Sequence, residues 1–232
     1  MDFSGWEKLS LVDYDDNITT TLFTSGCNFK CPFCHNGDLV LHPGETIKIP
    51  FEEIKEYLRK RQGVLDAVCV SGGEPTLMSD LEEKLTFIKS LNYKVKLDTN
   101  GSNPKTMKSL LEKHLVDYIA MDIKNSKEMY GKTIGVANYD LSLIEESVNF
   151  LLNSSFDYEF RTTLIDEFHI EKEIEEIGQW IKGAKRYFLQ HYIDSENCIQ
   201  HGLHEVPLEK AKSYSKILKK YIPQVYLRGY DD

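Results

Sequence analysis

The chain has 232 residues and a formal net charge of −9, with 41% hydrophobic and 28% charged residues. This composition is typical of a soluble globular protein and excludes a disordered or fibrous one. The negative charge repels nucleic-acid phosphates, and no run approaches the roughly 20 apolar residues of a membrane helix, so we expect a cytoplasmic protein that binds neither nucleic acid nor membrane.

Past residue 17, runs rich in β-branched and aromatic residues alternate with runs whose apolar residues recur every three or four positions. The first pattern predicts strands at 18–24, 66–72, 94–100, 117–124, 158–165 and 186–193, with a last strand near 224–230. The second pattern predicts helices at 50–62, 79–92, 104–115, 141–154, 171–184 and 207–222.

This alternation predicts parallel strands joined by right-handed crossovers. A closed eight-unit barrel needs about 250 residues, so we expect an α/β fold of the partial (β/α)6 TIM-like barrel type. We expect one domain over 1–232, with an entrance segment at 1–16, six β/α units over 17–193, and a helix and last strand over 194–232. Chemistry then belongs at the carboxyl edge of the sheet.

A loop after the first predicted strand, "GCNFKCPFCHN", contains Cys27, Cys31 and Cys34. Three thiolates can bind three irons of a [4Fe–4S] cluster and leave the fourth iron without a protein ligand. The alternative is a zinc site completed by His35, but structural zinc usually takes its ligands from two separated knuckles.

Two further cysteines lie outside this loop. Cys69 is expected to be a buried apolar residue within its strand. Cys198 lies in a polar loop with His201 and His204, which is weak evidence for a second metal site.

The loop residues "CNFKCPFC" resemble the CxxxCxxC signature of the radical S-adenosylmethionine superfamily, and "CHN" resembles the glycyl-radical-enzyme activases. The opening "GWEKLSLVDY" and the run "TTLFTSGCNFKCPFCHNGDLV" are similar to the activating proteins of anaerobic ribonucleoside-triphosphate reductase. The likeness continues through "VSGGEPTL", "LDTNG" and "MDIK" to "FRTTL".

The resemblance implies one [4Fe–4S] cluster and S-adenosylmethionine, which chelates the open iron. An electron then cleaves the sulfonium and releases a 5′-deoxyadenosyl radical, which abstracts hydrogen from a glycine of a partner glycyl-radical enzyme. The expected partner is anaerobic ribonucleotide reductase, and the expected electron donor is of the flavodoxin or ferredoxin type. The cofactors carry this chemistry and the protein orients them.

The resemblance also implies roles for residues beside the cysteines. Gly72 and Gly73 would approach the methionine part of the cofactor, and Glu74 would accept from its ammonium. Phe33 and His35 would contact the adenine, mainly through main-chain groups.

Lys124 is the implied partner of the cofactor carboxylate, and the oxygens of Asp98, Thr99 and Asp122 resemble ligands for a monovalent cation. The alternative for these residues is a turn at "DTNG" and a surface Asp–Lys pair.

Arg161 and His191 are candidates for cofactor contact, or else ordinary paired side chains. Asp13 matches an aspartate near the mouth of related activases, so the resemblance implies that it contacts the partner's backbone. In this chain "VDYDDN" stands where the family commonly has a Pro–Gly turn.

Two other functions stay open at this point. One is a radical enzyme that acts on a small molecule, like the 7-carboxy-7-deazaguanine synthases. The other is a non-enzymatic zinc-binding interaction module.

Overall fold

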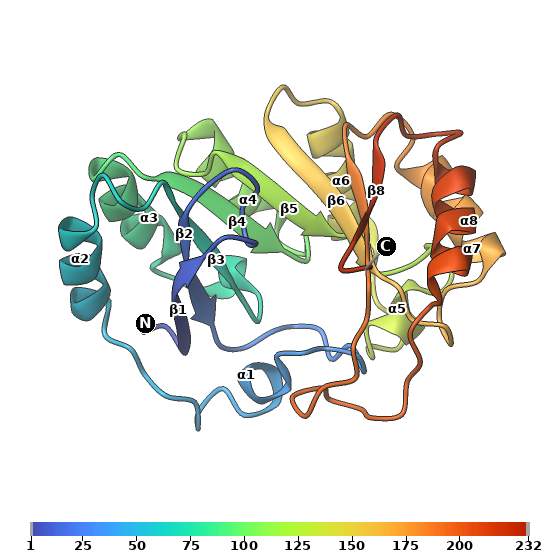
Figure 1. Ribbon diagram of the computed structural model, residues 1–232, viewed down its shortest axis with the longest axis horizontal. Helices are drawn as coiled ribbons and strands as arrows, with labels where there is room; N and C mark the ends of the chain where they lie inside the picture. Colours follow the sequence, from blue (N-terminus) through green and yellow to red (C-terminus); the bar gives the residue numbers. More distant parts are fainter. Residues whose placement is uncertain (1, 231–232) are drawn as a thin grey trace. The chain divides into compact units, whose positions relative to one another are not determined.

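The computed structural model describes residues 2–230. Among these residues, eight strands are hydrogen-bonded in chain order in one sheet (Figure 1). The strands are β1 Gly5–Ser10, β2 Thr19–Thr24, β3 Ala67–Gly72, β4 Lys94–Thr99, β5 Tyr118–Asp122, β6 Asp157–Thr163, β7 Tyr187–Gln190 and β8 Val225–Arg228. The helices are α1 Gly37–Leu41, α2 Phe51–Lys60, α3 Leu81–Ser90, α4 Pro104–Glu112, α5 Tyr130–Thr133, α6 Ser142–Leu152, α7 Glu171–Trp180 and α8 Leu208–Leu218, with a 3₁₀ turn, η1, at Pro75–Leu77.

Parallel strand pairs predominate in the sheet. β2 pairs with β3, β3 with β4, β6 with β7 and β7 with β8 in parallel register, whereas β1 runs antiparallel to β2. The four residues from Ala67 to Val70 are completely buried, as is typical of a parallel strand that is covered on both faces. The predicted α/β class with a mostly parallel sheet is confirmed.

Each predicted strand is present, with at least one of its ends displaced by one to three residues. Most displaced ends shorten the strand, but β6 begins at Asp157, one residue earlier than predicted. The sequence analysis assigned no strand to residues 1–16, whereas the structure has β1 at Gly5–Ser10. Three consecutive residues of β1, Glu7 to Leu9, are exposed. Without an alternating buried face, this segment lacks the pattern that reveals a strand in sequence.

The described residues form two compact units, one of 2–28 with 38–120 and the other of 29–37 with 121–230. Within the first unit α2 packs against α3, and α3 against β4; within the second, α7 packs against α8, and α8 against β8 (Figure 1). The expectation of a single domain stays a prediction. None of the helices within 2–230 is both long enough and apolar enough to cross a membrane.

Candidate active site

The turn after β3 contains the two glycines that the sequence analysis assigned to the cofactor. Gly72 has a φ of +114°, and a Cβ there would lie 2.4 Å from the main-chain N and O of Thr24. A Cβ on Gly73 would lie 2.0 Å from the carbonyl oxygen of Gly26, to which Glu74 N donates at 2.9 Å. Only glycine fits at these two positions, so the end of β3 can approach the backbone that leads into the cysteine loop.

The carboxylate of Glu74 joins this turn to the turn after β4. It is only 1% exposed. Its Oε1 accepts from the amide and the hydroxyl of Thr76 at 3.1 and 2.6 Å and from Thr99 Oγ1 at 2.8 Å, and its Oε2 accepts from Asn100 N at 2.6 Å. Burial raises the pKa of Glu74 above its usual range, although these four donors oppose the shift.

Asn100 is a site residue that the sequence analysis treated only as part of a turn dipeptide. Its side chain lies at the beginning of the cysteine loop, where Nδ2 donates to Asn28 Oδ1 at 2.9 Å and lies 3.7 Å from Cys27 Sγ. An Asn-Gly pair signals a turn whether or not its side chain has a further contact. The contact with Cys27 therefore had no signal in the sequence.

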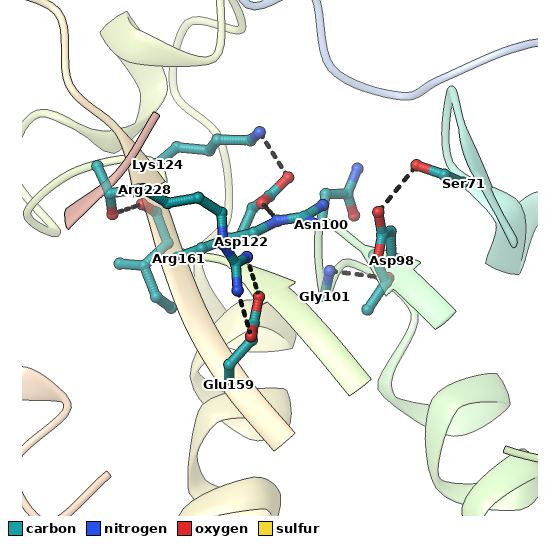
Figure 2. A network of polar contacts seen from close by, with 12 residues as sticks. Ser71, Asp98, Asn100, Gly101, Asp122, Lys124, Glu159, Arg161 and Arg228 are labelled. Carbon is teal, nitrogen blue, oxygen red and sulfur yellow. Dashed lines mark hydrogen bonds and ion pairs between the residues drawn. The ribbon is translucent and has the colours of Figure 1, made fainter. Parts of the chain in front are cut away.

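Two aspartates of the first unit are bound by neighbouring side chains. Asp98 accepts from Ser71 Oγ at 3.0 Å (Figure 2). It also accepts from Lys96 Nζ at 2.8 Å. Asp13 accepts from the Thr21 hydroxyl at 2.5 Å. The cation-binding role of Asp98 and the partner-binding role of Asp13 stay predictions.

In the second unit, Asp122 at the end of β5 lies between two cations. Lys124 Nζ donates to Oδ2 at 2.8 Å, and Arg161 Nε, from β6, donates to Oδ1 (Figure 2). Burial would raise the pKa of Asp122, but Arg161 and Lys124 lower it overall. The structure thus brings together three residues that the sequence analysis selected, with two positive charges for one negative charge.

Two cysteines of the loop lie close enough to Lys124 to interact with it electrostatically. Burial alone would lower the pKa of Lys124, but Asp122 and the thiolates of Cys31 and Cys34 raise it overall. Burial raises the pKa of the Cys34 thiol, and the Asn36 amide and Lys124 oppose that shift. A cation near two potential thiolate ligands favours their charged forms.

A second ion pair, with a buried carboxylate, lies on β6 and β8. Glu159, only 1% exposed, accepts from Arg228 Nη1 at 2.7 Å and from Nη2 at 3.2 Å (Figure 2). The Arg228 guanidinium also lies 3.7 Å from the Phe188 ring centroid. Glu159 and Arg161 are two apart in one strand, so they share a face of the sheet. The sequence analysis noted Arg161 but missed Glu159 and Arg228.

The two histidines selected from the sequence have partners within the protein. His35 Nε2 donates to the Ile193 carbonyl at 2.8 Å. His191 Nε2 lies 2.5 Å from Glu205 Oε2, and its ring centroid lies 4.7 Å from that of Tyr230. Phe33 is 3% exposed. Cofactor contact by these three residues stays a prediction.

His169, which the sequence analysis did not select, is completely buried beside the loop that carries Lys124. Its Nδ1 accepts from Ile165 N at 2.9 Å, so Nε2 carries the proton and donates to the Lys124 carbonyl at 3.0 Å. Burial lowers the pKa of His169, which keeps the ring neutral. His169 therefore fixes the main chain at Lys124.

The residues considered for a second metal site pair with other groups. Cys198 is buried, His201 Nδ1 lies 3.1 Å from Asp194, and His204 Nδ1 lies 2.6 Å from Glu167. Within residues 2–230, no group of three or more His, Cys, Asp or Glu side chains is placed to bind one metal ion. A zinc ion requires its ligands to converge on one point, whereas the thiolates of a four-iron cluster bind different irons.

Two proteins of Methanocaldococcus jannaschii are similar to the chain over most of its length, and both are named, provisionally, as glycyl-radical enzyme activating enzymes. One is 30% identical over 234 residues, which is 97% of this chain and 95% of the relative. The other is 30% identical over 230 residues, which is 96% of this chain and 85% of the relative.

A third relative covers less of the chain. A Thermococcus kodakarensis protein, named provisionally as a GTP 3′,8-cyclase, is 34% identical over 134 residues, which is 55% of this chain and 42% of the relative.

Solved structures share the fold. SuiB of Streptococcus suis, bound to S-adenosylmethionine, has a TM-score of 0.71 at 15% identity; the match covers 89% of this chain but only 49% of SuiB. A domain of a pyruvate-formate lyase-activating enzyme from Bacteroides vulgatus has a TM-score of 0.58 at 18% identity and covers 70% of this chain and 99% of that domain. These likenesses confirm the predicted partial barrel-like α/β fold.

The family model described as the Radical SAM superfamily matches residues 21–181, more than half of the chain. The matched region includes the three cysteines and all the site residues of β3 to β6. The chain therefore belongs to the Radical SAM superfamily of enzymes.

Proposed function

We propose that this enzyme activates a glycyl-radical enzyme, with anaerobic ribonucleoside-triphosphate reductase as the expected partner. The observation that carries the proposal is the 30% identity to a relative named as such an activating enzyme, over 97% of this chain and 95% of the relative. The expected electron donor is a flavodoxin or ferredoxin.

The family implies a [4Fe–4S] cluster and S-adenosylmethionine, and the residues present fit both. None of Cys27, Cys31 and Cys34 forms a disulfide, and thiolates are the usual protein ligands of such clusters. When bound, the cluster supplies the electron that cleaves S-adenosylmethionine. Lys124, in whose field Cys31 and Cys34 lie, is suited to bind the carboxylate of the cofactor.

The other residues have supporting roles in this proposal. Arg161 shares the charge of Asp122, so Lys124 keeps positive charge for a ligand. Gly72 and Gly73, which have no Cβ, would let the methionine part of the cofactor approach the main chain at the end of β3. We leave the monovalent cation out, because Asp98 is bound by Lys96 and Asp122 by two cations.

Electron paramagnetic resonance tests the proposal. Reduced protein, S-adenosylmethionine and anaerobic ribonucleotide reductase are mixed without oxygen, with Cys31→Ala as the control that should give no signal. We expect a glycyl radical on the reductase and release of 5′-deoxyadenosine. Cofactor cleavage without a glycyl radical on this or any related partner would falsify the activase assignment.

A second candidate is a radical enzyme that acts on a small molecule. It is favoured by the 34% identity to the Thermococcus kodakarensis relative, although that match covers only 55% of this chain. Turnover of a nucleotide or purine substrate without a protein partner would support it. The zinc-module alternative is tested by metal analysis after anaerobic purification, because the cluster requires about four irons per chain.

A further inference from the structure

The part of the cysteine loop that belongs to the second unit, residues 29–37, contacts a segment far along the chain. This segment, residues 193–202, follows β7 and lies outside the 21–181 region that matches the family model (Figure 1). We call residues 193–202 the clamp segment. It contains no helix or strand, so its contacts with the loop come from irregular backbone.

Three main-chain hydrogen bonds and one side-chain bond join the clamp segment to the loop. Gln200 N donates to the Pro32 carbonyl at 2.8 Å, and Ile199 N donates to the Cys34 carbonyl at 3.3 Å. Gly37 N donates to the Asn197 carbonyl at 3.0 Å. The fourth bond is from His35 Nε2 to the Ile193 carbonyl at 2.8 Å.

These four bonds lie on both sides of Cys34 in the sequence. The loop cannot form a helix or strand across Pro32, so its carbonyl groups need donors from elsewhere. The clamp segment supplies two of them, from Ile199 and Gln200. The conformation of the loop at Cys34 therefore depends on a segment more than 150 residues away.

Gly37 shows how closely the two segments approach. A Cβ at Gly37 would lie 2.5 Å from the Asn197 carbonyl oxygen, which no real contact allows, and 3.4 Å from Ile199 Cγ1. A larger residue would push the clamp segment away from the loop.

The clamp segment also has hydrogen bonds and contacts within itself and with the adjacent Tyr192. Cys198 is 6% exposed, its N donates to the Ser195 carbonyl at 2.9 Å, and its Sγ lies 3.7 Å from the Tyr192 hydroxyl. Gly202 N donates to Asp194 Oδ2 at 2.8 Å. These internal contacts restrict the conformation of the clamp segment, so the segment can hold the cysteine loop in one conformation.

We propose that residues 193–202 position Cys31 and Cys34 for the cluster before iron arrives, so that the ligand loop is preorganised in the apoprotein. The inference rests on the proposed role of these cysteines as cluster ligands. Preorganisation increases the affinity for a ligand because less ordering has to occur on binding. Gln200, Ile199 and Gly37 are positioning residues in this proposal.

Gln200→Pro, compared with Gln200→Ala, is the first test. Both variants lose the same exposed side chain, but only proline removes the N–H that donates to Pro32. We expect the proline variant, and not the alanine variant, to lose its iron at a roughly fivefold lower chelator concentration, the ratio expected for one hydrogen bond. Hydrogen exchange of the loop amides in the apoproteins should be faster by a similar factor.

Gly37→Ala, compared with Gly44→Ala, is the second test. A Cβ at Gly44 would meet nothing within 4 Å, so this control introduces the same methyl group without a clash. We expect faster exchange at the amides of Ile199 and Gln200 in the Gly37 variant alone, together with weaker iron retention.

The outcomes separate this inference from the proposed function. If the wild type binds about four irons while Gln200→Pro matches Gln200→Ala in iron retention and in exchange, the clamp proposal is overturned and the function is not. If the wild type binds no iron, the cluster-based function fails, and the positioning role fails with it. If a variant were unfolded as a whole, the amides of β3 would also exchange faster. In a folded variant with only a loosened loop, the amides of β3 should stay protected.

Discussion

Two carboxylates, the buried Glu74 of the first unit and the half-buried Asp122 of the second, are stabilised in opposite ways. Glu74 accepts four hydrogen bonds from hydroxyl and amide groups, and burial raises its pKa. Asp122 lies between Lys124 and Arg161, and these two cations lower its pKa. The neutral donors do not fully offset the burial of Glu74, so its ionised form is destabilised. The ionised form of Asp122 is instead stabilised by the two cations.

This difference indicates which region can bind a charged ligand. The four donors around Glu74 join two turns of the first unit, and its contact with the cofactor ammonium stays a prediction. Asp122 with its two cations carries a net positive charge, which can attract a carboxylate or a thiolate. We therefore expect a negatively charged ligand to bind near Lys124, in the second unit.

The largest loss of activity is expected when a cysteine of the loop is changed. These cysteines lie in both units: Cys27 contacts Asn100 in the first, and Cys31 and Cys34 lie near Lys124 in the second. Changing any one of the three to Ala should abolish reductive cleavage of S-adenosylmethionine, because each removes a cluster ligand. Product analysis by chromatography measures this.

Two other cysteines provide the controls. Cys69→Ala and Cys198→Ala should leave cleavage largely intact, since Cys69 is buried within β3 and the clamp bonds near Cys198 are formed by main-chain groups. Equal loss in Cys198→Ala would instead support a second metal site.

Asp122→Asn should cost about 3 kcal/mol of unfolding free energy at pH 7, because two half-buried cations lose an anion that is only 19% exposed. The pKa of Asp122 is lowered in the folded protein, so its contribution is present above the unfolded value of about 3.9 and is lost as pH falls through the folded pKa. The difference from wild type, measured by denaturant unfolding, should narrow in acid.

A surface pair provides the matched control for that change. Asp157→Asn removes an anion that is 68% exposed and lies 3.5 Å from Arg186. It should change stability by less than about 1 kcal/mol. If Asp157→Asn lowered the unfolding free energy as much as Asp122→Asn, the lower exposure of Asp122 could not explain its larger contribution to stability.

Glu74→Gln should cost about 2 kcal/mol, because an amide cannot accept all four hydrogen bonds. Its pH trend should be opposite to that of Asp122→Asn. The pKa of Glu74 is raised, so its contribution is full below the unfolded value of about 4.3 and is lost as pH rises through the folded pKa. Parallel pH trends for the two variants would contradict the comparison.

His169→Leu should cost about 1 kcal/mol at pH 7.5, since it removes two hydrogen bonds and fills the same space. The pKa of His169 is lowered, so its stabilisation is present above the unfolded value of about 6.5 and is lost as pH falls through the folded pKa. The free energy of unfolding, measured at pH 7.5 and at pH 5.5, should fall less on acidification in the variant than in wild type.

Much of the fold could be predicted because its strands are short, apolar and separated by amphipathic helices. The six predicted strands and the last strand near 224–230 are present. β1 was missed because its exposed residues lack an alternating pattern. Prediction of strand ends was less accurate, since the boundary depends on the neighbouring strand as well as on local residue preference.

The candidate site was predicted in part. Cysteine spacing, the "GGEP" turn and polar residues at strand ends are local patterns, and each has a chemical reason that can be read from the chain. Asn100, Glu159, His169 and Arg228 were not selected, because a single Asn, Glu, His or Arg has many ordinary explanations until its neighbours are known.

Local chemistry is enough to establish that this chain has alternating strands and helices and a loop with three thiols, since spacing and residue type require no distant partner. The tertiary structure was needed to show that Glu74 and Asp122 lie in opposite electrostatic environments and that residues 193–202 contact the cysteine loop. The physical reason is that pKa values and main-chain contacts depend on which groups approach through space, and that approach depends on packing of the whole unit.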